Sequence, residues 1–93
     1  MNEERARSLD ELREEVQEVD AAIVDLLGRR MSIVRAIGEV KRSQGIAVVD
    51  PAREAAVVAY VAQLARSAGL PEDDVRELFW RIMALSRREQ HAE

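Results

Sequence analysis

The chain has no cysteine and contains little histidine, proline, glycine or aromatic residue. Without cysteine it can form no disulfide and offers no thiolate for catalysis or metal binding. Its single histidine, His91, leads us to expect no histidine metal site. Aromatic residues are 3% of the 93 residues and β-branched runs are short, so the composition does not favour strands.

Long apolar runs and strong positive charge are missing as well. The longest stretch without a charged residue, 55–65, is shorter than the roughly 20 residues that a bilayer-spanning helix needs. The N-terminal residues lack the apolar core of a signal peptide. A net charge of −4 and a pI near 5.1 argue against nucleic-acid binding. We therefore expect a soluble, cytoplasmic protein with neither a membrane nor a nucleic-acid partner.

Helix start and stop signals divide the chain into three predicted segments. Ser8, followed three residues later by Glu11, is typical of a helix N-cap. Asp50 before Pro51 starts a second helix, and Gly69 ends it. The sequence therefore predicts one all-α domain. The domain spans 1–93, with helices over about 8–42, 51–68 and 72–90.

The predicted first helix carries an apolar line that a single charged residue interrupts. The line consists of Leu9, Leu12, Val16, Val19, Ile23, Leu26, Arg30, Ile33, Ile37 and Val40. An arginine is always charged, and an unpaired buried charge costs several kcal/mol. We expect an anionic partner for Arg30, which is either a glutamate or a ligand. Alternatively, a polar residue on such a line only sets helix register or oligomeric state.

The length of this helix predicts a dimer. About 35 residues make a helix of roughly 50 Å, whereas a compact monomer of this size has a radius of gyration of about 12 Å. The two shorter helices cannot cover the whole apolar line. A second copy of the chain can, so we predict an intertwined homodimer of three-helix chains.

Helix geometry decides which cations can share a small anion with Arg30. Lys41 lies about 20° around the axis from Arg30 and about 16 Å along it, so both side chains reach one small ligand. Arg13 lies about 25 Å away and about 100° around the axis, and can join them only from the other chain. Taken singly, Arg13 and Lys41 are equally typical of interhelical salt bridges.

Polar groups also interrupt the inner faces of the other two predicted helices. Arg53 and Glu54 precede the apolar stripe of the second helix, and Ser86 and Gln90 follow that of the third. Collected together, these groups would form a donor-lined pocket for a small polycarboxylate. Each also has an ordinary surface interpretation, and Asp50 is fully explained as a helix cap.

Six blocks of sequence resemble the all-helical chorismate mutases, in order and with the spacing of that family. The blocks are 12–16, 19–20, 26–30, 37–41, 50–54 and 86–90. They include the Asp-Pro-x-Arg-Glu turn and the Ser-x-x-x-Gln end, and the resemblance covers about residues 9–90.

The resemblance implies an interlocked dimer with two equivalent sites, in which Arg13 crosses from the partner chain. It implies that Arg13 contacts the substrate, that Arg30, Lys41 and Arg53 bind its two carboxylates, and that Ser86 helps to hold a carboxylate. Lys41 and Gln90 would face the ether oxygen of the breaking bond, and Arg30, Lys41 and Gln90 would be the catalytic residues. Glu54 and the Asp50 region would meet the ring hydroxyl. Apolar walls would come from Met31, Val34, Val57, Ile82 and Met83.

The implied activity is an isomerase reaction, chorismate to prephenate, in the shikimate pathway to phenylalanine and tyrosine, with no cofactor and no metal. Three alternatives stay open. The first is an isochorismate-pyruvate lyase on the same fold. The second is a regulatory or partner-dependent mutase domain, bound by or fused to an aromatic-pathway synthase or a prephenate-processing enzyme. The third is a purely structural coiled coil.

Overall fold

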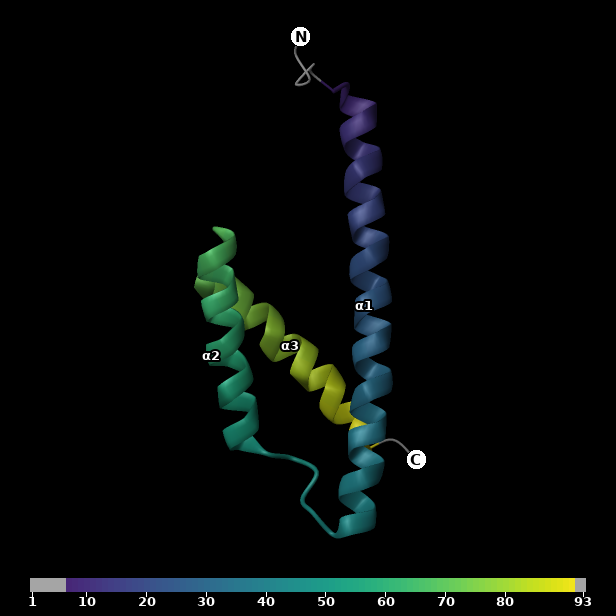
Figure 1. The fold of residues 1–93 in the computed structure, drawn as a ribbon, viewed down its shortest axis with the longest axis vertical. Coiled ribbons are helices and arrows are strands. Elements are labelled where there is room, and N and C mark those ends of the chain that lie inside the picture. The colour runs from purple at the N-terminus through teal and green to yellow at the C-terminus, as the bar shows by residue number, and fades with distance from the viewer. Residues whose placement is uncertain (1–6, 92–93) are drawn as a thin grey trace. The chain divides into compact units, whose positions relative to one another are not determined.

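The computed structural model describes the backbone of residues 7–91 and the side chains of residues 7–89. Three helices follow one another along this part of the chain, as Figure 1 shows. They are α1 (Leu9–Gln44), α2 (Pro51–Ala68) and α3 (Glu72–His91). No strand occurs between residues 7 and 91. The predicted all-α class, with one long and two shorter helices, is confirmed, and the homodimer stays a prediction.

Side-chain caps fix the starts of α1 and α2. The Ser8 hydroxyl accepts the N–H of Glu11 at 3.0 Å, and the Ser8 N–H donates to Glu11 Oε1 at 2.8 Å. This reciprocal pair is a capping box, as the sequence predicts. Asp50 Oδ1 accepts the N–H of Arg53 at 3.1 Å, which caps α2 immediately before Pro51.

Glycines in the left-handed conformation end α1 and α2. Gly45 has a φ of 70° and Gly69 a φ of 74°, a region that glycine enters without steric cost. After each glycine the next N–H turns back to a helix carbonyl at 2.8 Å, from Ile46 to Lys41 and from Leu70 to Ala65. Because the left-handed residue that ends the helix is Gly45, α1 continues to Gln44, two residues beyond the predicted end at position 42.

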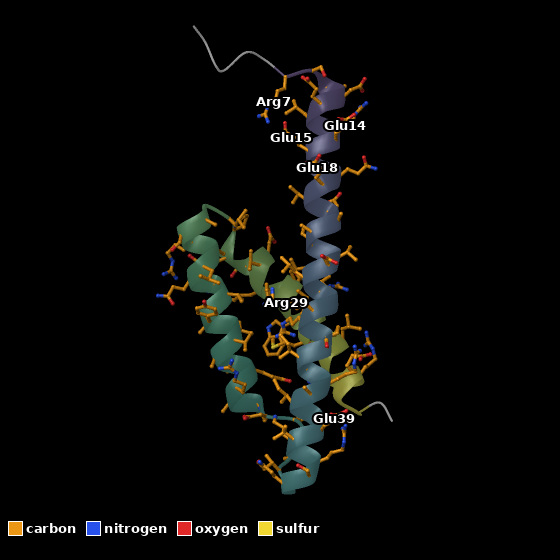
Figure 2. All side chains as sticks on the ribbon, turned by 45° about the vertical axis from the view of Figure 1, so that its right-hand side comes forward. Arg7, Glu14, Glu15, Glu18, Arg29 and Glu39 are labelled. Atoms are coloured by element: carbon orange, nitrogen blue, oxygen red, sulfur yellow. The ribbon has the colours of Figure 1, made fainter. Side chains whose placement is uncertain are left out.

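Contacts within the chain divide it into two units, Met1–Arg30 and Met31–Glu93. The described part of the first unit is residues 7–30, the N-terminal portion of α1. Arg7 forms an ion pair with Glu15 there, and Figure 2 shows both side chains near the start of the helix. The apolar residues of this part of the line are all exposed in the chain. They are Leu9, Leu12, Val16, Val19, Ile23 and Leu26.

The second unit contains the end of α1 with α2 and α3. Helices α2 and α3 pack against each other (Figure 1). The buried apolar side chains of this unit are Met31, Val34, Val61, Ala62, Ala65 and Met83. An ion pair between Arg35 and Glu89 joins α1 to the end of α3. This packing positions most of the residues considered next.

Candidate functional site

The predicted site residues fall in both units of the chain. Arg13 and Arg30 belong to the first unit, and the remaining ones belong to the second. Arg13 is exposed, whereas Arg30 is partly buried. Leu26 and Ile33, its apolar neighbours on the line, are 58% and 53% exposed. The charged residue is thus less exposed than the apolar residues on either side, which distinguishes it from a solvated surface arginine.

Lys41 is held at the end of α1 by a backbone carbonyl. Its Nζ donates to the oxygen of Val48 at 3.0 Å, and the side chain is partly buried. Val48 lies in the loop that leads to Asp50, so this bond directs the ammonium group toward the segment before α2. A lysine fixed in this way keeps its remaining N–H donors for an anion.

Asp50 and Arg53 occupy the first turn of α2. The carboxylate of Asp50 is used as the helix cap, which agrees with the structural interpretation of this residue. The Arg53 side chain is exposed. The backbone N–H of Arg53 donates to the Asp50 carboxylate, which fixes the position of Arg53 in the first turn of α2. The cap therefore sets the start of the helix segment that carries both Arg53 and Glu54.

Glu54 forms a two-pronged ion pair with Arg87 of α3. Arg87 Nε donates to Glu54 Oε2 and Arg87 Nη2 donates to Glu54 Oε1, each at 2.8 Å. Hydrogen bonding from this guanidinium lowers the pKa of the Glu54 carboxyl, against opposing effects of burial and of Asp50. Glu54 is therefore ionised and oriented.

Arg87 is the residue near the site that the sequence prediction overlooked. It lies in the block 86–90 yet received no role. A signal was present, because Phe79, Met83 and Arg87 follow one another at four-residue spacing on the inner face of α3. Its partner was not visible, since Glu54 is 33 residues away in the sequence.

The C-terminal turns of α3 carry Ser86 and Gln90. Ser86 is buried, at 8% exposure, and its hydroxyl donates to the carbonyl of Ile82 at 2.9 Å. To hold a carboxylate, that hydroxyl must redirect its proton. Gln90 belongs to α3, but its side chain lies outside the described residues. Glu89, the residue before Gln90, forms the ion pair with Arg35 that joins this end of α3 to α1.

A hollow of about 360 Å³ lies along the end of α1. Its lining residues are Ile33, Ala36, Ile37, Val40, Lys41, Gln44 and Ile46. Among them Lys41 is the charged one. Of the predicted apolar walls, Met31, Val34 and Met83 are buried, and Val57 and Ile82 are partly buried.

Chemically, the second unit offers one oriented lysine, an exposed arginine, a buried hydroxyl and an ionised carboxylate. These groups suit the binding of an anion that also carries a hydroxyl. Among the described side chains, those of residues 7–89, no three carboxylates gather where a metal ion could be held. No described helix has the length and apolar content needed to cross a bilayer.

Known proteins resemble this chain over most of its length. A sequence model described as chorismate mutase type II matches residues 12–91. A protein named T-protein from Enterobacter agglomerans is 36% identical over 75 residues, which are 81% of this chain and 20% of the T-protein. A chorismate mutase from Methanocaldococcus jannaschii is 29% identical over 65 residues, or 70% of this chain and 66% of that enzyme.

A protein named isochorismate pyruvate lyase, from Pseudomonas aeruginosa, is also similar. It is 36% identical over 80 residues, which are 86% of this chain and 78% of the lyase. The chain spans about a fifth of the length of the T-proteins that it matches.

Proposed function

Because the chain belongs to the chorismate mutase type II family, we propose that it rearranges chorismate to prephenate. One observation carries the proposal: the family match extends over residues 12–91. That interval contains every predicted site residue, from Arg13 to Gln90. The fold supports the proposal as well, since the described chain is built of one long and two shorter helices.

The proposed reaction is unimolecular. The ether C–O bond of chorismate breaks while a C–C bond forms within the same molecule, and no group is transferred to the protein. The protein must hold a dianion in a compact shape in which the reacting carbons are close. It must also stabilise the negative charge that grows on the ether oxygen as the C–O bond breaks.

The site residues divide between these two tasks. Arg13, Arg30, Arg53 and Ser86 hold the two carboxylates. Lys41 and Gln90 donate to the ether oxygen, and Lys41 also contributes to carboxylate binding. Glu54, with the Asp50 region, accepts the ring hydroxyl. Support for the last role comes from the ionised state and fixed orientation of the Glu54 carboxylate.

We further propose that the chain acts as a homodimer and forms a single mutase domain. The apolar line of α1 is exposed in the single chain from Leu9 to Val40, apart from Arg30. Such a line on a helix of 36 residues is typical of a surface that another helix covers. In the proposed dimer, Arg13 of each chain completes the site of the other.

The direct test is to add pure protein to chorismate, follow the loss of chorismate absorbance and identify the product. We expect prephenate as the product, with saturation kinetics. Sedimentation at micromolar concentration, measured on the same sample, should give the mass of a dimer. Absence of prephenate would contradict the proposed activity, and a fully folded monomer would contradict the proposed assembly.

A second candidate function is the elimination of pyruvate from isochorismate. It is favoured by the 36% identity to a protein named isochorismate pyruvate lyase, over 78% of that protein's length. A coupled assay for pyruvate, with isochorismate as the substrate, distinguishes the two. Release of pyruvate that is faster than the rearrangement of chorismate would establish the lyase instead.

A partner enzyme is proposed from the greater length of the T-proteins that the chain matches. Since the chain matches about a fifth of each T-protein, such a domain also occurs within longer proteins. We propose that it can act within, or beside, a second aromatic-pathway enzyme. Weak mutase activity that increases when such an enzyme is added would support this arrangement.

A further inference from the structure

We infer that Arg87 is a positioning residue, which holds the Glu54 carboxylate in the orientation that receives the substrate's ring hydroxyl. The inference rests on the proposed function. It adds a residue to which neither the family resemblance nor the sequence pattern gives a role.

The geometry of the pair supports this inference first. Both oxygens of Glu54 accept from one planar guanidinium, through Nε and Nη2, at 2.8 Å each. A two-pronged pair of this kind fixes the plane of the carboxylate, which a single contact does not. An ionised carboxylate has about four lone-pair sites, so two accepted bonds leave capacity for a substrate hydroxyl.

The surroundings of the Glu54–Arg87 pair also support the positioning role of Arg87. The Glu54 side chain is 18% exposed, so it is largely shielded, whereas the Arg87 side chain that pairs with it is 39% exposed. Arg87 directly follows Ser86 and precedes Gln90 by one helical turn. The same α3 segment therefore carries two predicted substrate contacts and the group that orients a third.

The charge of Arg87 also favours the ionised form of the Glu54 carboxyl, the form that accepts a hydrogen bond from the ring hydroxyl. Among the described residues, the groups that shift the Glu54 carboxyl are Arg87 on α3 and Asp50 at the start of α2. Arg87 favours the ionised form and Asp50 opposes it. Without Arg87, Glu54 keeps the unfavourable neighbour and loses the favourable one, so it becomes protonated at a higher pH.

A merely structural pair would act differently, and α2 and α3 share a matched example. Arg66 Nε donates to Glu72 Oε2 at 2.8 Å and Arg66 Nη2 donates to Glu72 Oε1 at 3.2 Å. This second two-pronged pair also joins the two helices, but neither residue is a predicted substrate contact. It provides the control for a purely mechanical role.

The test compares Arg87→Met with Arg66→Met in the full chain, with Arg87→Lys as a variant that keeps the charge. For Arg87→Met we expect kcat/KM with chorismate to fall by about tenfold to a hundredfold, as misplacement of a substrate contact costs. The acid limb of the pH profile should move to higher pH. Arg87→Lys should keep the acid limb and recover part of the loss. Arg66→Met should leave both quantities unchanged.

Two further measurements distinguish positioning from structure. In a Glu54→Gln background, Arg87→Met should cause little further loss, because the group that it orients is already altered. With the methyl ether of the ring hydroxyl as substrate, the loss caused by Arg87→Met should shrink, since that analogue has no hydroxyl proton to donate. Circular dichroism and the thermal midpoint verify that each variant is folded.

The outcomes separate the inference from the function on which it rests. A wild-type protein that rearranges chorismate, with Arg87→Met unchanged or with losses that simply add to those of Glu54→Gln, overturns the inference alone. If Arg87→Met proves unfolded, the same criteria apply to Arg87→Lys. A folded wild-type protein that does not rearrange chorismate overturns the proposed function and the inference together.

Discussion

At the scale of single residues, the informative feature is where charge meets an apolar face. Arg30 interrupts the apolar line of α1 and is less exposed than Leu26 and Ile33, its neighbours on that line. Lys41, one of the predicted catalytic residues, is tethered by the carbonyl of Val48. A tethered donor loses less rotamer entropy when it binds a ligand than a mobile one. The proposed rearrangement forms no covalent bond between substrate and protein, so it depends on such preorganised groups.

Removing the Lys41 ammonium should therefore cost mainly activity. For Lys41→Ala we expect kcat to fall by about a hundredfold to a thousandfold, the range found when one donor to a developing negative charge is lost. Arg42→Ala, at the exposed neighbouring position, is the control and should retain wild-type kcat. Near-normal kcat/KM in Lys41→Ala, with the dimer intact, would contradict the proposed site.

Gln90 gives a pH prediction at the same scale. An amide donates at any pH, so kcat should be flat on the alkaline side, between about pH 6 and pH 8. In Gln90→Glu the side chain donates only when protonated, so kcat should decline as pH rises through the pKa of that carboxyl. Steady-state profiles of the two proteins test this. A sharp alkaline loss in the wild type would count against the role of Gln90.

At the scale of the helices, local chemistry explains where each one begins and ends. Ser8 with Glu11, and Asp50 with Arg53, form caps that can be recognised in the sequence, because donor and acceptor are three residues apart. Glycine at positions 45 and 69 permits the positive φ that ends α1 and α2. These features were predictable since each depends on only a few consecutive residues.

Gly69→Ala should lower the free energy of unfolding by about 1–2 kcal/mol, the cost of a left-handed conformation for a residue with a Cβ. A Cβ at position 69 would meet no atom within 4 Å, so the cost is one of backbone conformation and not of packing. Urea unfolding measures the difference. Ser67→Ala, at an exposed position inside α2, is the control, expected to lie within about 0.5 kcal/mol of the wild type. An equal effect of both substitutions would disprove this account of Gly69.

The Glu54–Arg87 pair predicts how the stability of α2 against α3 depends on pH. The pKa of Glu54 is lowered from its ordinary value of 4.5 in the folded chain. The pair therefore stabilises the fold above that value, and the contribution disappears as pH falls through the lowered folded pKa. The contribution is moderated by solvent, because the Arg87 side chain is 39% exposed.

Thermal midpoints of the wild type and Glu54→Gln measure this contribution. The wild type should be the more stable at neutral pH, and the two midpoints should converge below about pH 4. Glu77→Gln, in which an exposed carboxyl of α3 is replaced, controls for a general effect of acid. A difference between wild type and Glu54→Gln that stayed constant across this range would refute the assignment.

At the scale of the whole molecule, two features of a single chain call for the proposed dimer. The apolar line of α1 is exposed in one copy, and Arg13 is too far along the helix from Arg30 to share a small ligand with it. Both points follow from helix geometry. Each is explained if another copy covers the line and supplies Arg13.

Mixed dimers test this arrangement. Arg13→Ala and Lys41→Ala should each have only a small fraction of wild-type activity as homodimers. A mixed dimer has one site that combines the intact Lys41 of one chain with the intact Arg13 of the other. After the variants are unfolded and refolded together in equal amounts, activity should return to about a quarter of the wild-type value, as random pairing in a two-fold dimer gives. No recovery, with mixed dimers demonstrated by mass spectrometry, would show that Arg13 does not cross between chains.

The sequence by itself determined the helices, their caps, the apolar line and the family. Each of these is written in short-range spacing or in ordered blocks along the chain. Only the tertiary structure decided that Glu54 pairs with Arg87 across 33 residues and that Lys41 binds the carbonyl of Val48. The first pairing depends on the rotation and approach of packed helices, and the second on the path of a loop. Neither is encoded in the periodicity of one segment.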